Sequence, residues 1–219
     1  MLLLAAAYPS TPPGELGQMP IGRRDALLLA LREATFGSRI ASVAPCPQCH
    51  EQLELAFGHA DLPSHQFNGD APQLLEVDGY ALRFRCINSD DLAALGTGNA
   101  SLPEPRLALF GRCVLEARRA EARIAVEHLP AQVLEALEAH LARADLGADL
   151  RIAVECPACG HRWQALFDIV SFFWSEIESW ACRLLHEVHA LASAYGWSER
   201  EILALSPFRR RCYLDMVGA

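Results

Sequence analysis

Two Cys-Pro-x-Cys motifs, far apart in the chain, constrain the fold more than any other feature. They are CPQC at residues 46–49 and CPAC at residues 156–159. Each motif lies in a segment that opens with Arg-Ile-Ala and continues past the motif with alternating apolar and polar residues, at 39–57 and 151–167. Such alternation predicts strands, so each segment is expected to form a strand, a knuckle and a second strand. The sequence therefore contains an internal repeat of one small β unit.

Two knuckles of this kind favour a structural zinc site. Zn²⁺ binds four cysteine thiolates in a tetrahedral shell, and one C-x-x-C turn can supply two of them. The predicted ligands are Cys46, Cys49, Cys156 and Cys159. Because four thiolates leave no position for water, the expected Zn²⁺ is structural and not catalytic. The 106 residues between Cys49 and Cys156 would then form an insertion in a split zinc ribbon.

Other uses of these cysteines fit the pattern less well. A haem attachment site requires export to an oxidising compartment. A thiol redox pair is expected at the start of a helix, where the helix dipole lowers the thiol pKa, and neither motif precedes a helical pattern. Buried cysteines without a metal are the remaining alternative. His50 and His161 each follow a knuckle and could replace a cysteine ligand, although a place outside the metal shell suits them better.

The acidic composition limits the partners of the chain. It has 19 Lys and Arg against 27 Asp and Glu, for a formal net charge of -8. Nucleic acids and anionic membranes both favour a basic surface, so this balance argues against them. No apolar run reaches the roughly 18 residues that cross a membrane, and the apolar start lacks the basic residues of a signal peptide. We therefore expect a cytoplasmic protein with reduced thiols, whose first residues pack on its body.

Between the two knuckles, the sequence predicts one further hairpin and several helices. Residues 9–20 are rich in Pro and Gly and are expected to be irregular, and residues 21–35 are expected to be helical. Residues 75–84 predict a hairpin with a type I′ turn at Asp78-Gly79, and Asn88 or Ser89 is expected to cap a short helix. Good helix formers predict two more helices. They are expected at residues 105–123 and 130–145.

From residue 168 onward the chain predicts one long helix and two short ones. The apolar positions of the long helix alternate between spacings of four and three, as in a helix that packs against another. These positions are Ile177, Ala181, Leu184, Val188 and Leu191. Ser198 with Glu201 forms a capping box for the next helix, and Ser206 followed by Pro207 begins the last.

The predicted fold class is therefore α+β. It consists of zinc-ribbon-like β-hairpins with two knuckles, a mostly helical insertion and a helical C-terminal tail. The predicted domains are an N-terminal arm and helix (1–38), a split zinc ribbon with an inserted hairpin and helices (39–167), and a helical tail for partner docking (168–219).

Sequence patterns of known catalytic sites do not occur in the chain. It lacks G-x-S-x-G, Walker A, G-x-G-x-x-G and H-E-x-x-H motifs. His186 and His189 flank Glu187 on a predicted helix, but polar residues that flank a packed seam explain them much better than a metal site does. We therefore predict no catalytic residue and no small-molecule substrate.

The start of the long helix favours a surface for a protein partner. Residues 167–180, FDIVSFFWSEIESW, are more apolar than one core-facing stripe requires. A basic cluster at residues 209–211 would suit an acidic partner or RNA, although such clusters are more often a solvated helix face. The predicted partner-binding residues are Phe173, Trp174, Trp180, Trp197, Arg209 and Arg210.

The tail resembles a known protein family. In residues 184–217 a His-containing helix is followed by Tyr-Gly-Trp-Ser, by Glu-Ile-Leu, by an Arg-rich turn and by Tyr-Leu. This pattern resembles the baseplate hub assembly chaperone and tail-assembly family of T4-type contractile phages. Residues 156–177, CPACGHRWQALFDIVSFFWSEI, look like the branch of that family found in contractile injection gene clusters. The resemblance is strongest over residues 150–217.

The resemblance implies a non-enzymatic helper that promotes assembly of a baseplate or hub, or a minor component of it. Its implied partners are baseplate or hub proteins of a contractile tail-like particle, and it offers no catalytic residues. In this hypothesis the zinc ribbon fixes the scaffold and the helical tail presents the docking face. The alternative is a zinc-ribbon nucleic-acid-binding or transcription accessory protein, and a third class is a metal-dependent hydrolase.

Overall fold

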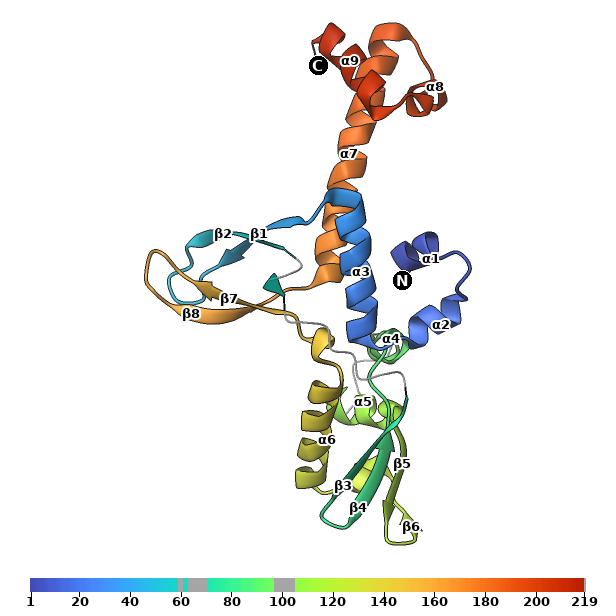
Figure 1. Ribbon diagram of the computed structural model, residues 1–219, viewed down its shortest axis with the longest axis vertical. Helices are drawn as coiled ribbons and strands as arrows, with labels where there is room; N and C mark the ends of the chain where they lie inside the picture. Colours follow the sequence, from blue (N-terminus) through green and yellow to red (C-terminus); the bar gives the residue numbers. More distant parts are fainter. Residues whose placement is uncertain (59–60, 63–70, 97–104, 219) are drawn as a thin grey trace. The chain divides into compact units, whose positions relative to one another are not determined.

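The computed structural model describes residues 1–58, 61–62, 71–96 and 105–218 (Figure 1). The chain forms two compact units, Met1–Ile169 and Val170–Ala219. The predicted α+β class is confirmed, because the structure combines β-hairpins, four clustered cysteines at hairpin turns and a long C-terminal helix. The division into arm, split ribbon and tail stays a prediction. Within the described ranges, no helix has both the length and the apolar character that crossing a membrane requires.

The first unit begins with three helices, α1 (Leu2–Ala7), α2 (Pro13–Gln18) and α3 (Ile21–Phe36). Leu4 of α1 is fully buried, and α1 contacts α3, so the apolar start packs on the body as predicted. The helix expected at 21–35 is confirmed by α3. The expectation of an irregular segment at 9–20 is wrong for α2. Its Pro13 lies in the first turn, where backbone N–H groups have no helical partner and proline costs little.

The N-terminus of α3 is capped by a residue from a distant part of the chain. The Gly22 N–H donates to Asp145 Oδ2 at 2.9 Å, and the Asp145 side chain is buried. A Cβ on Gly22 would overlap Asp145 Oδ1 and would lie 2.9 Å from the backbone of Gly147 and Ala148. Only glycine therefore allows this approach. Burial raises the pKa of Asp145, although the Gly22 amide opposes that shift.

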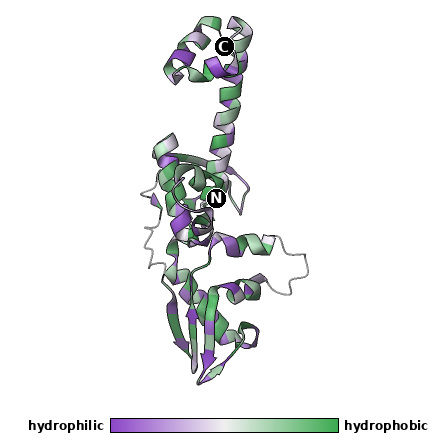
Figure 2. Ribbon diagram, turned by 90° about the vertical axis from the view of Figure 1, so that its right-hand side faces the viewer, coloured by the Kyte–Doolittle hydropathy of each residue, from purple (hydrophilic) through white to green (hydrophobic). Residues whose placement is uncertain are grey.

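A four-stranded antiparallel sheet forms the core of the insertion. Its strands are β3 (Gln73–Val77), β4 (Tyr80–Phe84), β5 (Val114–Arg119) and β6 (Ala122–Arg123), in that order. Asp78 and Gly79 have φ values of 50° and 77°, both positive, which confirms the predicted type I′ turn between β3 and β4. Figure 2 shows both hydrophobic and hydrophilic residues along these strands. Burial alternates residue by residue along β4, as expected for a sheet with one buried face.

Helices cover that buried face. They are α5 (Pro105–Cys113) and α6 (Ala131–Ala144), and the short 3₁₀ helices η2 (Val126–His128) and η3 (Leu146–Ala148) follow β6 and α6 (Figure 1). Leu82 and Phe84 of β4 pack with Val133 and Leu137 of α6, and none of the four is exposed. The helix predicted at 130–145 is confirmed by α6.

The helix predicted at 105–123 is only half right. The helix α5 ends at Cys113, and the chain continues directly as β5. The segment contains good helix formers, but β5 pairs with β4 along its length and buries Ala117 against the helices. Sheet pairing and burial therefore outweigh a local preference of a few tenths of a kcal/mol per residue. Ala120, with a φ of 51°, turns the chain into β6.

A buried carboxylate joins the sheet to α4 (Ser89–Gly96) and α5. The Asp91 N–H donates to Asn88 Oδ1 at 2.9 Å, and the Asn88 N–H donates to Asp91 Oδ2 at 3.1 Å, which confirms Asn88 as the predicted cap. Asp91 is fully buried and pairs with Arg85 at 2.6 Å and with Arg112 at 3.0 Å. Burial raises the pKa of Asp91, but the bonds from Arg85 and from the Asn88 amide outweigh it and hold that pKa below the usual value.

The second unit is helical, and it contains the one long helix and the two short helices that the sequence predicts after residue 168. It comprises α7 (Ile169–Tyr195, from Val170 on), α8 (Glu199–Ala204) and α9 (Pro207–Val217). Ser198 and Glu201 form the expected capping box. Ser206 caps α9, because its side chain accepts a hydrogen bond from the Arg209 N–H, and Pro207 is the first residue of that helix. Leu191 of α7, Ile202 of α8 and Leu214 of α9 form its small core. The apolar positions of α7 predicted that it packs against another helix, and this packing is seen at the C-terminal end of α7.

Candidate metal centre

Two β-hairpins position the cysteines. The first pairs β1 (Arg39–Pro45) with β2 (Gln52–Gly58), and the second pairs β7 (Arg151–Glu155) with β8 (Arg162–Leu166). Each C-x-x-C motif occupies the turn of its hairpin, as the sequence predicts. The closing pairs, Pro45 with Gln52 and Glu155 with Arg162, fall at equivalent positions of the repeat.

The two turns have the same backbone hydrogen bonds. In the first, the His50 N–H donates to the Cys46 carbonyl at 2.9 Å and the Cys46 N–H donates to the Glu51 carbonyl at 2.9 Å. In the second, the Gly160 N–H donates to the Cys156 carbonyl at 2.8 Å, and the Cys156 N–H donates to the His161 carbonyl at 2.9 Å. The repeat detected in the sequence is thus a structural repeat.

The four sulfur atoms converge from the two turns. The Sγ atoms of Cys46 and Cys159 lie 3.7 Å apart, those of Cys49 and Cys156 lie 3.6 Å apart, and all four lie within 4.8 Å of one another. A tetrahedral Zn²⁺ with Zn–S bonds of about 2.3 Å requires S–S edges of about 3.8 Å. The donor set therefore fits such an ion in both type and spacing. Each short distance joins one knuckle to the other.

The thiols strongly influence one another's ionisation. Burial raises the pKa of Cys46, but the N–H groups of Cys49 and Gln48 outweigh it and lower that pKa to about 7. The Glu51 N–H lowers the pKa of Cys49, but desolvation and the three neighbouring cysteines raise it to about 12. Four thiolates this close repel one another, so all four can ionise together only beside a cation.

Apart from the cysteines, little apolar surface holds the two hairpins together. Leu53 and Val154 are buried between them with Cys46 and Cys156, and half-buried residues such as Trp163 surround this cluster. Phe57 and Phe167 add one edge-to-face contact, with ring centroids 5.1 Å apart. A two-stranded hairpin is marginally stable alone, so the cysteine cluster is the natural attachment between the two.

Neither histidine beside a knuckle belongs to the cysteine cluster. Where the chain is described, the only group of three or more potential ligands within this range consists of the four cysteines. The His161 ring stacks on Trp163 with centroids 5.8 Å apart, and the exposed His50 occupies the turn with a φ of 61°. These positions agree with the expectation that both residues lie outside the metal shell.

The six predicted partner-binding residues differ in how far they are exposed. Trp174 and Trp180 of α7 are 50% and 49% exposed, and Arg209 is exposed. Phe173 is only 2% exposed, and Arg210 is held by Glu187 at 3.0 Å and by the Leu205 carbonyl.

Trp197 is half-buried. Its ring stacks on Tyr195 at 4.6 Å and meets Tyr213 edge-on at 4.9 Å. Sequence reasoning missed Phe208 of α9, which is 77% exposed. Its helical phase, which differs from that of the buried Leu214, could have indicated this.

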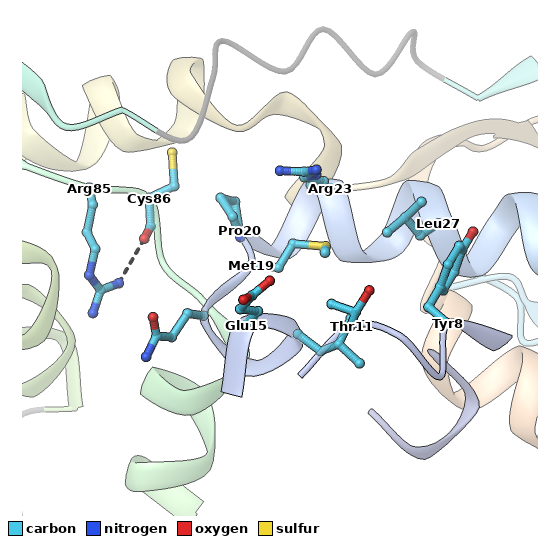
Figure 3. Close-up of a pocket in the computed structure, with 11 residues that line it drawn as sticks. Tyr8, Thr11, Glu15, Met19, Pro20, Arg23, Leu27, Arg85 and Cys86 are labelled. Carbon is cyan, nitrogen blue, oxygen red and sulfur yellow. Dashed lines mark hydrogen bonds between the residues drawn. The ribbon is translucent and has the colours of Figure 1, made fainter. Parts of the chain in front are cut away.

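A separate groove of about 520 Å³ lies beside α2 and α3 (Figure 3). Tyr8 and Thr11 come from the arm, Arg23 comes from α3, and Arg85 and Cys86 follow β4. Arg85 donates to the Cys86 carbonyl and is held by Asp91, so its guanidinium is already engaged. The groove therefore does not present Arg85 to a ligand.

Comparison with known proteins identifies the family. No curated protein and no solved structure matches the chain. The family model of the T4 bacteriophage base plate protein matches residues 4–174, which includes both knuckles and ends within α7. This match confirms the family that the sequence resemblance suggested. The resemblance was strongest at residues 150–217, whereas the match lies mainly before the tail. Because the match covers more than three quarters of the 219 residues, the chain belongs to the T4 bacteriophage base plate protein family.

Proposed function

We propose that this protein is a non-enzymatic assembly chaperone, or a minor baseplate or hub component, of a contractile phage-tail-like injection system. Membership of the baseplate family supports this proposal and implies other baseplate proteins as partners. The proposed machinery consists of a zinc-stapled scaffold and a helical docking surface. The family membership carries the assignment to a baseplate, and the cysteine cluster carries the scaffold.

The scaffold proposal assigns a structural Zn²⁺ to Cys46, Cys49, Cys156 and Cys159. The observation that supports it is the spacing of four sulfur atoms, two from each hairpin, at distances close to the edges of a tetrathiolate shell. Such a shell is closed, so the metal would not bind water or substrate. It would link residues 39–58 to residues 151–166 and fix the base of the insertion between them.

The docking proposal assigns partner contacts to the exposed aromatic residues of α7. Trp174 and Trp180 each leave about half of a large side chain exposed, which is costly for a surface with no partner. Tryptophan is also the residue type most enriched at the energetic centre of protein interfaces. Phe173 is buried and therefore unavailable to a partner. The contacts of Trp197 and Arg210 favour roles inside the second unit.

Particle assembly tests the proposed function. Deleting the gene should abolish complete contractile particles in electron micrographs, and a plasmid copy should restore them. Mass spectrometry of purified particles then separates a chaperone, which is absent from them, from a minor component, which is present. Normal particles in the deletion strain would refute both forms of the proposal. A salt-dependent mobility shift with DNA or RNA would favour the nucleic-acid-binding alternative.

Metal analysis tests the scaffold. The purified chain should contain one zinc per molecule, and replacing zinc by cobalt should give the visible absorption of a tetrahedral sulfur-ligated ion. A chain that holds no metal as purified and takes up none on reconstitution would refute the zinc site, while leaving the assembly proposal to its own experiment.

A further inference from the structure

The hairpins of the metal centre have an exposed strand edge. Each consists of two strands only, β1 with β2 and β7 with β8. In the described part of the chain, no further strand is hydrogen-bonded to β2. The outer side of β2 is therefore a row of backbone groups without a ladder partner.

The hydrogen-bond pattern shows which residues of β2 form this edge. The Cys46 N–H donates to the Glu51 carbonyl, which makes these two residues a hydrogen-bonded pair. Such pairs alternate along an antiparallel ladder, so Leu53 and Leu55 bond to β1. The intervening Gln52 and Glu54 then turn their N–H and C=O groups outward.

A groove of about 470 Å³ follows this edge. One wall consists of the consecutive residues 51–55, and the other consists of Glu155, Pro157 and Ala158 from the second hairpin. Leu53 and Leu55 contribute apolar surface to it. The length and the consecutive lining suit an extended segment of polypeptide.

The charge of the groove is negative. Its ionisable side chains are Glu51, Glu54 and Glu155, and no Lys, Arg or His lines it. Glu155 is paired with Arg162 at 2.8 Å, whereas Glu51 and Glu54 have no ion pair within the described ranges. A basic side chain is the complement of this wall.

We propose that the groove beside β2 binds an extended, basic segment of a partner protein, which adds to β2 as a third strand. The outward backbone groups of Gln52 and Glu54 supply the main-chain hydrogen bonds, and the carboxylates of Glu51 and Glu54 select Lys or Arg beside them. The proposal rests on the proposed function only in taking that partner to be a baseplate or hub protein.

The second hairpin provides a contrast within the same molecule. By the structural repeat, Glu51 corresponds to His161 and Glu54 corresponds to Gln164. The equivalent edge of β8 therefore has the same backbone but lacks the two carboxylates. Selectivity for a basic strand is expected at β2 and not at β8.

Peptide binding to the full-length, metal-loaded chain tests this site. The probes are an eight-residue peptide of alternating Lys and Thr and the same peptide with Glu in place of Lys. We expect the Lys peptide to shift the backbone amide NMR signals of residues 52–56 and to bind about tenfold more weakly in high salt. Equal binding of the Glu peptide, or no change at residues 52–56, would overturn the proposal.

Matched variants separate the edge from the rest of the ribbon. Proline at an outward position of an edge strand removes one donor without breaking the ladder, so Glu54→Pro should weaken binding by about tenfold or more. Gln164→Pro is the control and should leave binding unchanged, and an equal loss in both variants would refute the site. Glu54→Lys keeps the backbone and should also abolish binding of the Lys peptide, which provides the test if Glu54→Pro does not fold.

The peptide experiment does not depend on particle assembly. Binding of the Lys peptide in a protein that proves dispensable for particles would refute the proposed function and leave the groove standing. Failure of the peptide to bind would refute the groove and leave the assembly role intact.

Discussion

The sulfur atoms of Cys46 and Cys159 lie 3.7 Å apart, although 113 positions separate the two residues in the chain. This contact links the first turn of the repeat to the second, and the contact between the sulfur atoms of Cys49 and Cys156 is a second such link. The insertion between the hairpins, with its own sheet and helices, is thus closed into a loop at its base. The predictions below test that closure and the packing around it.

Loss of one proposed metal ligand should strongly destabilise the first unit. Cys159→Ser is expected to lose the metal and about 4 kcal/mol of unfolding free energy, a fall of roughly 10 °C in melting temperature for a unit of this size. Zinc content and thermal unfolding measure the two effects. Cys182→Ser is the control, because Cys182 is exposed and lies outside the cluster. Unchanged stability of Cys159→Ser would contradict the closure.

Substitutions at equivalent positions of the two knuckles should change stability in opposite directions. His50 and Gly160 both have positive φ values, 61° and 72°, in which a side chain is strained. His50→Gly should therefore stabilise the protein by about 1 kcal/mol, and Gly160→Ala should destabilise it by about as much. Chemical denaturation of metal-loaded protein measures both. Destabilisation by His50→Gly would mean that the histidine makes a contact that outweighs its backbone strain.

The contact between Gly22 and Asp145 should not tolerate a methyl group. Gly22→Ala is expected to cost about 2 kcal/mol, because the new Cβ would collide with Asp145 and with the backbone of residues 147 and 148. Gly14→Ala is the matched control. Gly14 is also helical, nothing lies within 4 Å of its added Cβ, and the change should stabilise by up to about 1 kcal/mol. Equal effects of the two changes would argue against the tight contact.

The Asp91 cluster should make stability depend on pH. The folded-state pKa of Asp91 is depressed, so its contribution is present above the unfolded pKa, near 3.8, and is lost as pH falls through the lower folded value. Asp91→Asn should cost about 3 kcal/mol at pH 7, because it leaves Arg85 and Arg112 without their carboxylate. The difference from the wild type should shrink below pH 4. Asp90→Asn, at the exposed neighbouring position, should cost much less stability at pH 7 than Asp91→Asn.

The tryptophans of the second unit should separate binding from stability. Trp174→Ala and Trp180→Ala remove half-exposed side chains and should weaken capture of baseplate proteins, by about 2 kcal/mol if they are central to the interface, with little change in melting temperature. Trp197→Ala should instead lower the melting temperature, because Trp197 packs on Tyr195 and Tyr213. Pulldown from a lysate that expresses the whole gene cluster, with thermal unfolding alongside, distinguishes the cases. Full retention of every partner by Trp174→Ala and Trp180→Ala would contradict the docking surface.

Features that depend on a few neighbouring residues were predictable from the sequence. Asp78-Gly79 indicated a type I′ turn and Ser198 with Glu201 indicated a capping box, because the turn and the cap are formed by those residues themselves. The candidate metal site was predictable for a different reason. Each knuckle supplies half of a tetrahedral shell, so the presence of two similar knuckles indicated that they share one metal ion. This inference did not depend on their separation in the chain.

Features that depend on distant neighbours were not predictable. Residues 114–119 have the composition of a helix, and only pairing with β4 makes them a strand. Phe173 and Arg210 looked available for a partner, but one side chain is buried and the other is held by Glu187. No sequence pattern around Asp145 indicates that its side chain caps the start of α3.

The sequence alone thus determined the two knuckles, most helix and turn boundaries, and the family, because these follow from short-range spacing and residue chemistry. The tertiary structure decided that the four sulfurs meet, that residues 114–119 join a sheet, and which aromatic side chains stay exposed. These outcomes depend on burial and on pairing between segments far apart in the chain, and the energies involved exceed local preferences.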